Sequence, residues 1–137
     1  MKTLMVVVEK TEAGFSTYLK DVDGVVATGA TFDEVKSEME RAVAFHKEGL
    51  IEFGEDVPVE LQGEITFEYV MDFETLFTWL NGIITKSGLA KVAGLNQSLV
   101  SQYAVGIKKP SEKQLKKMEA SLHKFGGLLQ EIHFEAV

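Results

Sequence analysis

Residues 89–103, LAKVAGLNQSLVSQY, predict two short helices joined by a tight turn. Leu89, Val92 and Ala93 recur at helical spacing, and Gly94 can adopt the left-handed conformation that ends a helix. A second helix is expected over residues 97–105, because Asn96 is a favoured N-cap residue. The inward face of that helix carries Leu99, Val100 and Tyr103, and its outward face carries Gln97, Ser98, Ser101 and Gln102.

The residues that follow this stretch extend the helical pattern. Lys108-Lys109-Pro110 is a basic loop, and Ser111 with Gln114 is a capping box that opens a further helix. We expect Gly126-Gly127 to break that helix. Residues 128–137 fit either a last strand or a helical extension, and the sequence does not decide between them.

Residues 73–125 resemble a repressor-type helix-turn-helix, with the Leu-Ala, Gly, Gln, Val-Ser and Lys-Pro elements all in register. The resemblance implies that Gln97, Ser98 and Gln102 contact bases. It also implies that Lys86 contacts the DNA backbone and that Lys108 and Lys109 bind phosphate.

The same residues suit nucleic acid on chemical grounds. The outward amides fit bidentate adenine recognition, and Asn96 with the helix N-terminus fits a phosphate. This helix has no arginine, so specificity would rest on amides, hydroxyls and DNA shape. The alternative is a helical bundle with a polar face and solvated lysines.

The first half of the chain has strand patterns around one helix. Residues 4–8 are a continuous apolar run, residues 15–19 alternate, and residues 25–27 form a third short strand. Thr31 with Glu34 is a capping box for a helix that we expect to stop at Gly49. After a loop over residues 52–64, alternating apolar residues over 65–71 predict a strand packed under the helix. The pattern predicts a βββαβ unit, and the change to helical spacing after Asp72 places the domain boundary there, between residues 1–72 and 73–137.

Residues 18–35, YLKDVDGVVATGATFDEV, resemble the HicB antitoxin family. In that family a strand ends in Asp and Gly, the next strand ends in Gly-x-Thr, and a helix opens with Glu. The corresponding residues here are Asp21, Gly24, Gly29, Thr31 and Glu34, whereas Lys20 and Asp23 stand where the family often has proline. The resemblance implies a partial ribonuclease H-like fold that blocks a small basic mRNA-cleaving toxin of the HicA type, joined to a DNA-binding domain that represses the shared operon.

The distribution of charge agrees with two different partners. Residues 1–72 carry 6 basic and 16 acidic side chains, and residues 73–137 carry 8 and 5. An acidic unit would attract and mask a basic, RNA-binding toxin. Asp21, Asp23 and Asp33 are the candidate toxin contacts. Their alternative role is local, as turn and first-turn residues.

Composition excludes several classes of function. The chain has no cysteine and three isolated histidines, so it offers no thiolate zinc site, disulfide or cysteine nucleophile. It has neither a phosphate loop nor a nucleophile elbow, and the spacing of its carboxylates does not require a magnesium site. We therefore expect no metal, no cofactor and no enzyme activity. With no run of eighteen apolar residues and no signal peptide, we expect a soluble cytoplasmic protein.

The sequence as a whole predicts an α+β chain of two domains, acting as antitoxin and autorepressor. We expect a homodimer or a higher oligomer, because a two-fold pair reads half-sites about 34 Å apart on DNA. The alternative is a stand-alone dimeric helix-turn-helix regulator whose first domain dimerises or senses a ligand.

Overall fold

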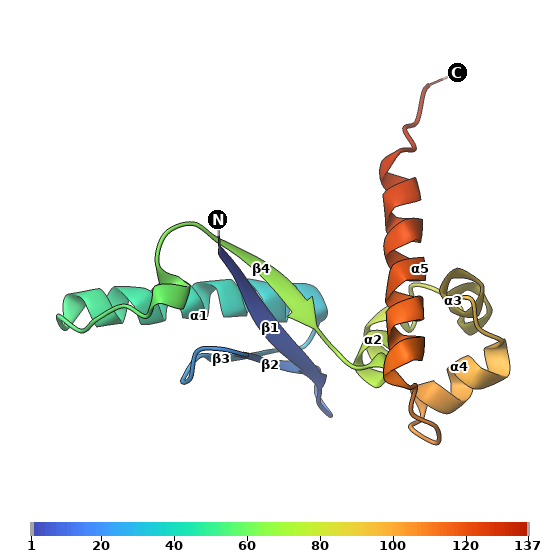
Figure 1. The fold of residues 1–137 in the computed structure, drawn as a ribbon, viewed down its shortest axis with the longest axis horizontal. Helices are drawn as coiled ribbons and strands as arrows, with labels where there is room; N and C mark the ends of the chain where they lie inside the picture. Colours follow the sequence, from blue (N-terminus) through green and yellow to red (C-terminus); the bar gives the residue numbers. More distant parts are fainter. Residues whose placement is uncertain (1, 137) are drawn as a thin grey trace. The chain divides into compact units, whose positions relative to one another are not determined.

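The computed structural model describes residues 2–136, in which a four-stranded mixed sheet and five α-helices form an α+β fold (Figure 1). The chain divides into two compact units, residues 1–79 and 80–137. The division falls after Trp79, whereas the sequence placed it at Asp72. Helix α2 (Phe73–Leu80) accounts for the difference, because Phe73 and Thr75 are buried and the Trp79 ring packs 4.9 Å from the ring of Phe32.

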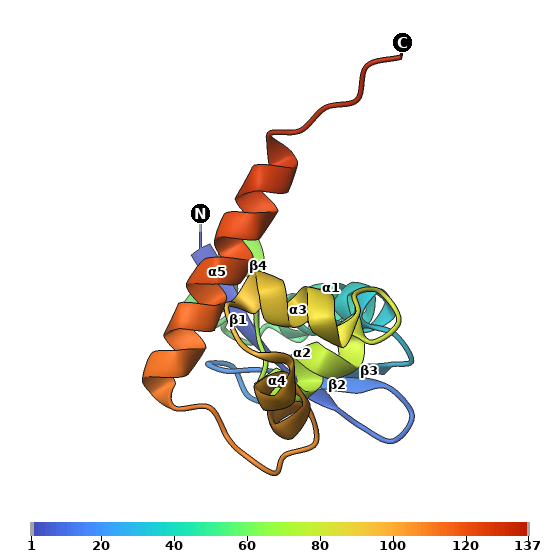
Figure 2. The ribbon, with the colours of Figure 1, turned by 90° about the vertical axis from the view of Figure 1, so that its right-hand side faces the viewer.

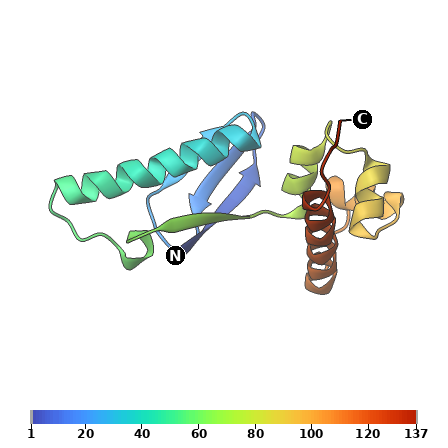
Figure 3. The same cartoon turned by 90° about the horizontal axis from the view of Figure 1, so that it is seen from above.

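The first unit is built on a sheet with the strand order β3-β2-β1-β4. Strand β1 pairs antiparallel with β2 and parallel with β4, and β3 pairs antiparallel with β2. The long helix α1 (Phe32–Glu52) follows β3 and lies along one face of the sheet (Figure 3). The strands are β1 (Lys2–Lys10), β2 (Phe15–Leu19), β3 (Val26–Gly29) and β4 (Ile65–Val70).

The core of the first unit lies between the sheet and α1. Alternate residues of β1 and β2 point toward the helix, and Val35 and Met39 of α1 are fully buried against them. The predicted apolar face of residues 65–71 packs against this core, as expected. The buried strand residues are Leu4, Val6, Val8, Phe15, Thr17 and Leu19.

The connection from β3 to α1 is tight. The hydroxyl of Thr31 accepts a hydrogen bond from the backbone N–H of Glu34 at 3.1 Å, which confirms the predicted N-cap. A Cβ atom on Gly29 would lie 2.7 Å from the backbone nitrogen of Val35. Glycine at position 29 therefore allows the edge strand to approach the first turn of the helix.

Two predicted helix ends are wrong. Helix α1 continues past Gly49 to Glu52, and α5 (Glu112–Gln130) runs through Gly126 and Gly127. An interior glycine weakens a helix by about 1 kcal/mol relative to alanine, which does not end it where the backbone hydrogen bonds continue. The chain after α5 forms neither a strand nor further helix up to residue 136.

The loop between α1 and β4 has one regular turn that the sequence did not predict. This is the short 3₁₀ helix η1 (Val59–Leu61), and it brings the side chain of Leu61 into full burial.

The phenol ring of Tyr69 on β4 lies next to an aromatic and a basic side chain of α1. Its ring meets that of Phe32 edge-on at 5.5 Å, and the Nζ atom of Lys36 lies 5.1 Å from the Tyr69 ring. Its buried hydroxyl has no hydrogen-bond partner among residues 2–136. Burial, and then the negative charge of Glu40, raise the pKa of Tyr69, so the phenol is neutral at physiological pH.

The second unit consists of helices packed around α3 (Lys86–Ala93), which contacts both α4 (Gln97–Ala104) and α5 (Figure 2). Its buried side chains come from all three helices, so none of them buries its apolar face alone. They are Leu89, Ala90, Ala93, Val100, Tyr103, Ala104 and Met118, and Leu80 at the end of α2 is buried with them.

We predict that Gly29→Ala lowers the free energy of unfolding of the first unit by about 1–3 kcal/mol, because the added methyl group must displace backbone atoms of α1. The measurement is urea unfolding followed by the fluorescence of Trp79, the single tryptophan, which packs against this core.

Gly49→Ala is the matched control. An added Cβ at position 49 meets no atom within 4 Å, and the position is helical, so this variant should gain up to about 1 kcal/mol. Equal effects of the two substitutions would show that the approach of β3 to α1 is not tight.

Candidate functional site

The most complete candidate site is built on α3 and α4. Thr85 caps α3 by accepting a hydrogen bond from the N–H of Gly88 at 3.0 Å. Gly94 then ends the helix in a left-handed conformation with φ of 73°, as the sequence predicted. The N–H of Leu95 donates to the carbonyl of Ala90, which closes the turn before α4 begins. The turn thus fixes the direction in which α4 leaves α3.

Helix α4 separates its polar residues from its apolar ones. Its buried side chains, which face the interior of the second unit, are Val100, Tyr103 and Ala104. Leu99 is half-buried. Gln97 and Ser98 are exposed on the first turn, and Ser101 and Gln102 are half-buried one turn later. These four residues therefore lie on one helix, with the two nearest the N-terminus fully accessible to a partner.

Asn96 has a defined structural role at the start of α4. Its side-chain oxygen accepts a hydrogen bond from the N–H of Leu99 at 2.7 Å, which confirms the predicted N-cap. The cap uses the oxygen of the amide and leaves its nitrogen for another partner. Asn96 can thus order the helix and donate to an anion at the same time.

The basic loop after α4 is anchored to the helix that precedes it. The carbonyl of Gln102 accepts from the N–H groups of Ile107 at 3.0 Å and of Lys108 at 3.3 Å. Lys108 and Lys109 are both exposed, so the loop presents two cations beyond the C-terminus of α4. Lys86 is exposed in the first turn of α3.

Charge distinguishes this unit from the first one. Residues 80–137 carry 8 basic and 4 acidic side chains, a net charge of +4. Residues 1–79 carry 6 basic and 17 acidic side chains, a net charge of −11. A polyanion is attracted by the second unit and repelled by the first.

The three aspartates predicted to bind a toxin do not form one cluster. Asp21 and Asp23 share the turn between β2 and β3, and Asp33 lies in the first turn of α1. Strand β3 separates them, a distance on the order of 13 Å along its four residues. All three are exposed, so each position is accessible, and Asp21 and Asp23 are neighbours in one turn.

The sheet has an uncovered apolar row that the sequence analysis missed. Val26, Tyr18, Val7 and Val70 are directly paired across the four strands, and their side chains share the face opposite α1. The exposed fractions are 69% for Val26, 43% for Tyr18 and 41% for Val70. The signal was present in the run over residues 4–8, because a strand with apolar residues at consecutive positions is apolar on both faces.

Acidic side chains border this row. Glu9 lies two residues after Val7 on β1, and Glu68 lies two residues before Val70 on β4, so both share the uncovered face. We call Val7, Tyr18, Val26 and Val70 with these two glutamates the open sheet face. Its apolar centre and acidic border suit a protein partner with a basic rim.

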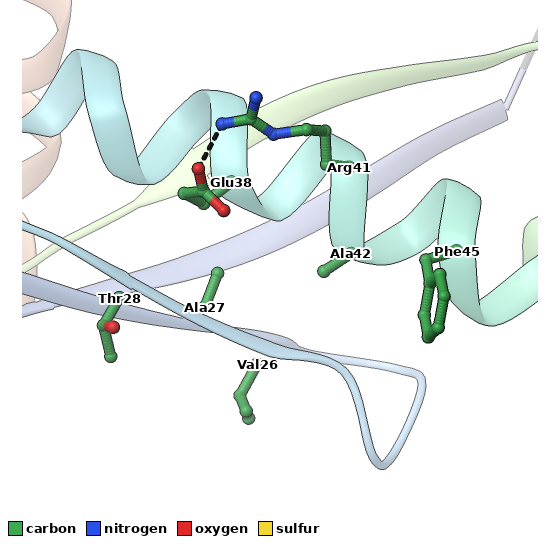
Figure 4. Close-up of a pocket in the computed structure, with 7 residues that line it drawn as sticks. All are labelled: Val26, Ala27, Thr28, Glu38, Arg41, Ala42 and Phe45. Carbon is green, nitrogen blue, oxygen red and sulfur yellow. Dashed lines mark hydrogen bonds and ion pairs between the residues drawn. The ribbon is translucent and has the colours of Figure 1, made fainter.

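A shallow groove runs along the edge of the same sheet, between β3 and α1 (Figure 4). Ala27 points toward α1, Phe45 projects from the helix with 79% of its surface exposed, and Glu38 forms an ion pair with Arg41 on the rim. Among residues 2–136, β3 is hydrogen-bonded to a strand on one side only, which makes it an edge strand of the sheet.

The described residues hold no group of three or more His, Asp or Glu side chains placed to bind a metal ion. No helix within residues 2–136 is long and apolar enough to span a bilayer. Comparisons with family models, curated proteins and solved structures found no match to this chain.

We predict that Asn96→Ala lowers the free energy of unfolding of the second unit by about 1 kcal/mol, because the N–H of Leu99 loses its partner. Asn96→Asp retains an oxygen at the same place and serves as the control. Urea unfolding followed by helical circular dichroism measures both. If the aspartate variant lost as much stability as the alanine variant, the capping role would be contradicted.

Proposed function

We propose that this chain is the antitoxin of a type II toxin-antitoxin system, with DNA binding by the second unit and toxin binding by the first. The observation that carries the proposal is α4, a capped helix with an accessible polar first turn, followed by an exposed basic loop on a unit of net positive charge. In this proposal α3 and α4 act as a repressor-type helix-turn-helix, and the first unit is a partial ribonuclease H-like domain.

The chemistry of α4 supports sequence-specific recognition of DNA. An α-helix fits the major groove of B-DNA, and glutamine amides there can form two hydrogen bonds with adenine. Gln97 and Ser98 stand on the exposed first turn, where the recognition helix of this motif class reads bases. Ser101 and Gln102 extend the same face, and Asn96, Lys86, Lys108 and Lys109 supply contacts to phosphate.

The charge and surface of the first unit support the antitoxin role. A toxin that cleaves mRNA must bind a polyanion, so its active surface carries positive charge. The open sheet face offers such a toxin an apolar centre between Glu9 and Glu68, and Asp21 and Asp23 add negative charge at the turn before β3. Masking that surface would block access of RNA.

A second candidate function assigns a different partner to the open sheet face. Exposed apolar rows are also covered by a second copy of the same chain, and the protein would then be a dimeric regulator without a toxin. A test with the small basic protein encoded by the neighbouring reading frame distinguishes an antitoxin from a stand-alone regulator. An antitoxin binds that protein and stops its RNA cleavage, whereas a stand-alone regulator does neither.

We predict that Tyr18→Arg weakens toxin binding by at least about tenfold, because it places a cation in the centre of a surface that meets a basic partner. Isothermal titration with a catalytically inactive toxin measures the dissociation constant. Ala44→Arg adds the same charge at an exposed position of α1 and should leave binding within about twofold. Equal losses would show that overall charge, and not the open sheet face, decides the affinity.

We predict that Gln97→Ala costs roughly 1–3 kcal/mol on a duplex selected from a random pool and little on an unselected duplex. Lys108→Ala and Lys109→Ala should weaken binding to both duplexes and lower the salt dependence by about one counterion each. Lys47→Ala on α1 is the control. A loss of equal size on both duplexes for Gln97→Ala would contradict its role in reading bases.

A further inference from the structure

The chain contains two asparagines, Asn81 and Asn96, which lie in different surroundings. Both are exposed. Asn81 follows the last residue of α2 and precedes Gly82, whereas Asn96 stands directly before α4 and precedes Gln97. These neighbours decide what each side-chain amide can do.

The turn that holds Asn81 is closed by hydrogen bonds on either side of it. The carbonyl of Leu80 accepts from the N–H groups of Ile83 at 2.8 Å and of Ile84 at 3.0 Å. Neither the Asn81 side chain nor the Gly82 N–H has a hydrogen-bond partner within residues 2–136. The two groups can therefore react with each other without first losing a hydrogen bond.

Gly82 leaves its own backbone nitrogen unshielded. The residue is exposed and has a φ of 88°, and a Cβ atom built there meets no atom within 4 Å. Glycine tolerates a wide range of φ, so the chain here can rotate until the Gly82 nitrogen approaches the Cγ atom of Asn81. The rate of an intramolecular reaction depends on how readily such a near-attack arrangement is reached.

We propose that Asn81 is a site of spontaneous deamidation. The backbone nitrogen of Gly82 attacks Cγ of Asn81 and forms a new C–N bond. The Cγ–Nδ2 bond breaks, and the side-chain nitrogen leaves as ammonia with the proton from Gly82, which gives a cyclic succinimide. Water then opens the ring at one of its two carbonyls and leaves aspartate or isoaspartate at position 81. A water molecule is consumed and an ammonia molecule released, so the reaction needs no enzyme and no cofactor.

Asn96 is held in a way that opposes the same reaction. Its side-chain oxygen accepts a hydrogen bond from the N–H of Leu99 at 2.7 Å, and the next residue, Gln97, is the first residue of α4. Ring closure would require the side chain to leave the cap and the backbone of Gln97 to leave the helix. The chain thus contains a reactive asparagine and a protected one.

Deamidation changes both the charge and the main chain next to α2. The new carboxylate lies at the C-terminal end of α2, where the helix dipole disfavours negative charge. The net charge of residues 80–137 falls from +4, with 8 basic and 4 acidic side chains, to +3. Isoaspartate also adds a carbon atom to the main chain inside the turn that Ile83 and Ile84 close on Leu80. None of these changes depends on whether the chain binds DNA or a toxin.

Peptide mass spectrometry of the full chain, incubated at mildly alkaline pH, tests the proposal. Trypsin cleaves after lysine and arginine, so it places Asn81 in peptide 48–86 and Asn96 in peptide 92–108. Fragment ions should show the mass gain of replacing NH₂ by OH at position 81, accumulating at least about tenfold faster than at position 96. An isoaspartyl methyltransferase should label peptide 48–86 and not peptide 92–108. Equal conversion of the two asparagines, or no conversion at position 81, would overturn the proposal.

Two variants separate the chemistry of the Asn-Gly pair from the effect of the structure. Asn81→Gln keeps an amide on a longer side chain that cannot close the same ring, so conversion in peptide 48–86 should fall to the level of peptide 92–108. Gln97→Gly gives Asn96 the same following residue as Asn81 and leaves the Asn96 cap in place, so position 96 should still react several-fold more slowly than position 81. Helical circular dichroism checks that both variants are folded.

Each variant has an outcome that would overturn the proposal. Unchanged conversion of peptide 48–86 in Asn81→Gln would place the reaction at another residue. Equal rates at positions 81 and 96 in folded Gln97→Gly would show that the open turn after α2 does not select Asn81.

Discussion

In both units, the described residues 2–136 include large apolar side chains that the unit's own helices and strands leave exposed. In the first unit one helix, α1, is placed against a four-stranded sheet, and it can shield only one of the two faces. In the second unit α5, with 19 residues, is longer than the 8-residue α3 that it contacts. Small domains bury a smaller fraction of their surface than large ones, so these units leave apolar residues for other molecules to cover.

This incomplete coverage of apolar side chains explains where the candidate partner surfaces lie. The open sheet face exists because α1 packs on the other side, held there by Val35 and Met39 and by the close approach of Gly29. Leu128 and Leu129 are exposed on the second half of α5, which extends past α3 and α4. The polar face of α4 has a different origin, since Val100 and Tyr103 fix the orientation of the helix and thereby turn Gln97 and Ser98 outward.

The sequence predicted the features that depend on neighbouring residues. The N-caps at Thr31, Asn96 and Ser111 each involve a backbone N–H three residues later, and the turn at Gly94 needs only a residue that tolerates positive φ. The helix ends at Gly49 and Gly126 were wrong, because a glycine inside a helix is a small local cost that neighbouring hydrogen bonds overcome. The open sheet face was missed for another reason: the strand pattern identifies apolar faces, but the number of helices that cover a sheet is a tertiary property.

The proposed roles of the two units, toxin binding by the first and DNA binding by the second, follow from their charge as much as from their shape. The net charge of −11 in residues 1–79 repels nucleic acid and attracts a basic protein, and that of +4 in residues 80–137 does the reverse.

The most direct test of the central claim is the affinity of the purified chain for the DNA upstream of its own reading frame and for a scrambled duplex, at two salt concentrations. The proposal predicts tighter binding to the upstream DNA, with affinity falling steeply as salt rises. Equal affinity for the two duplexes, or binding to neither, would contradict it.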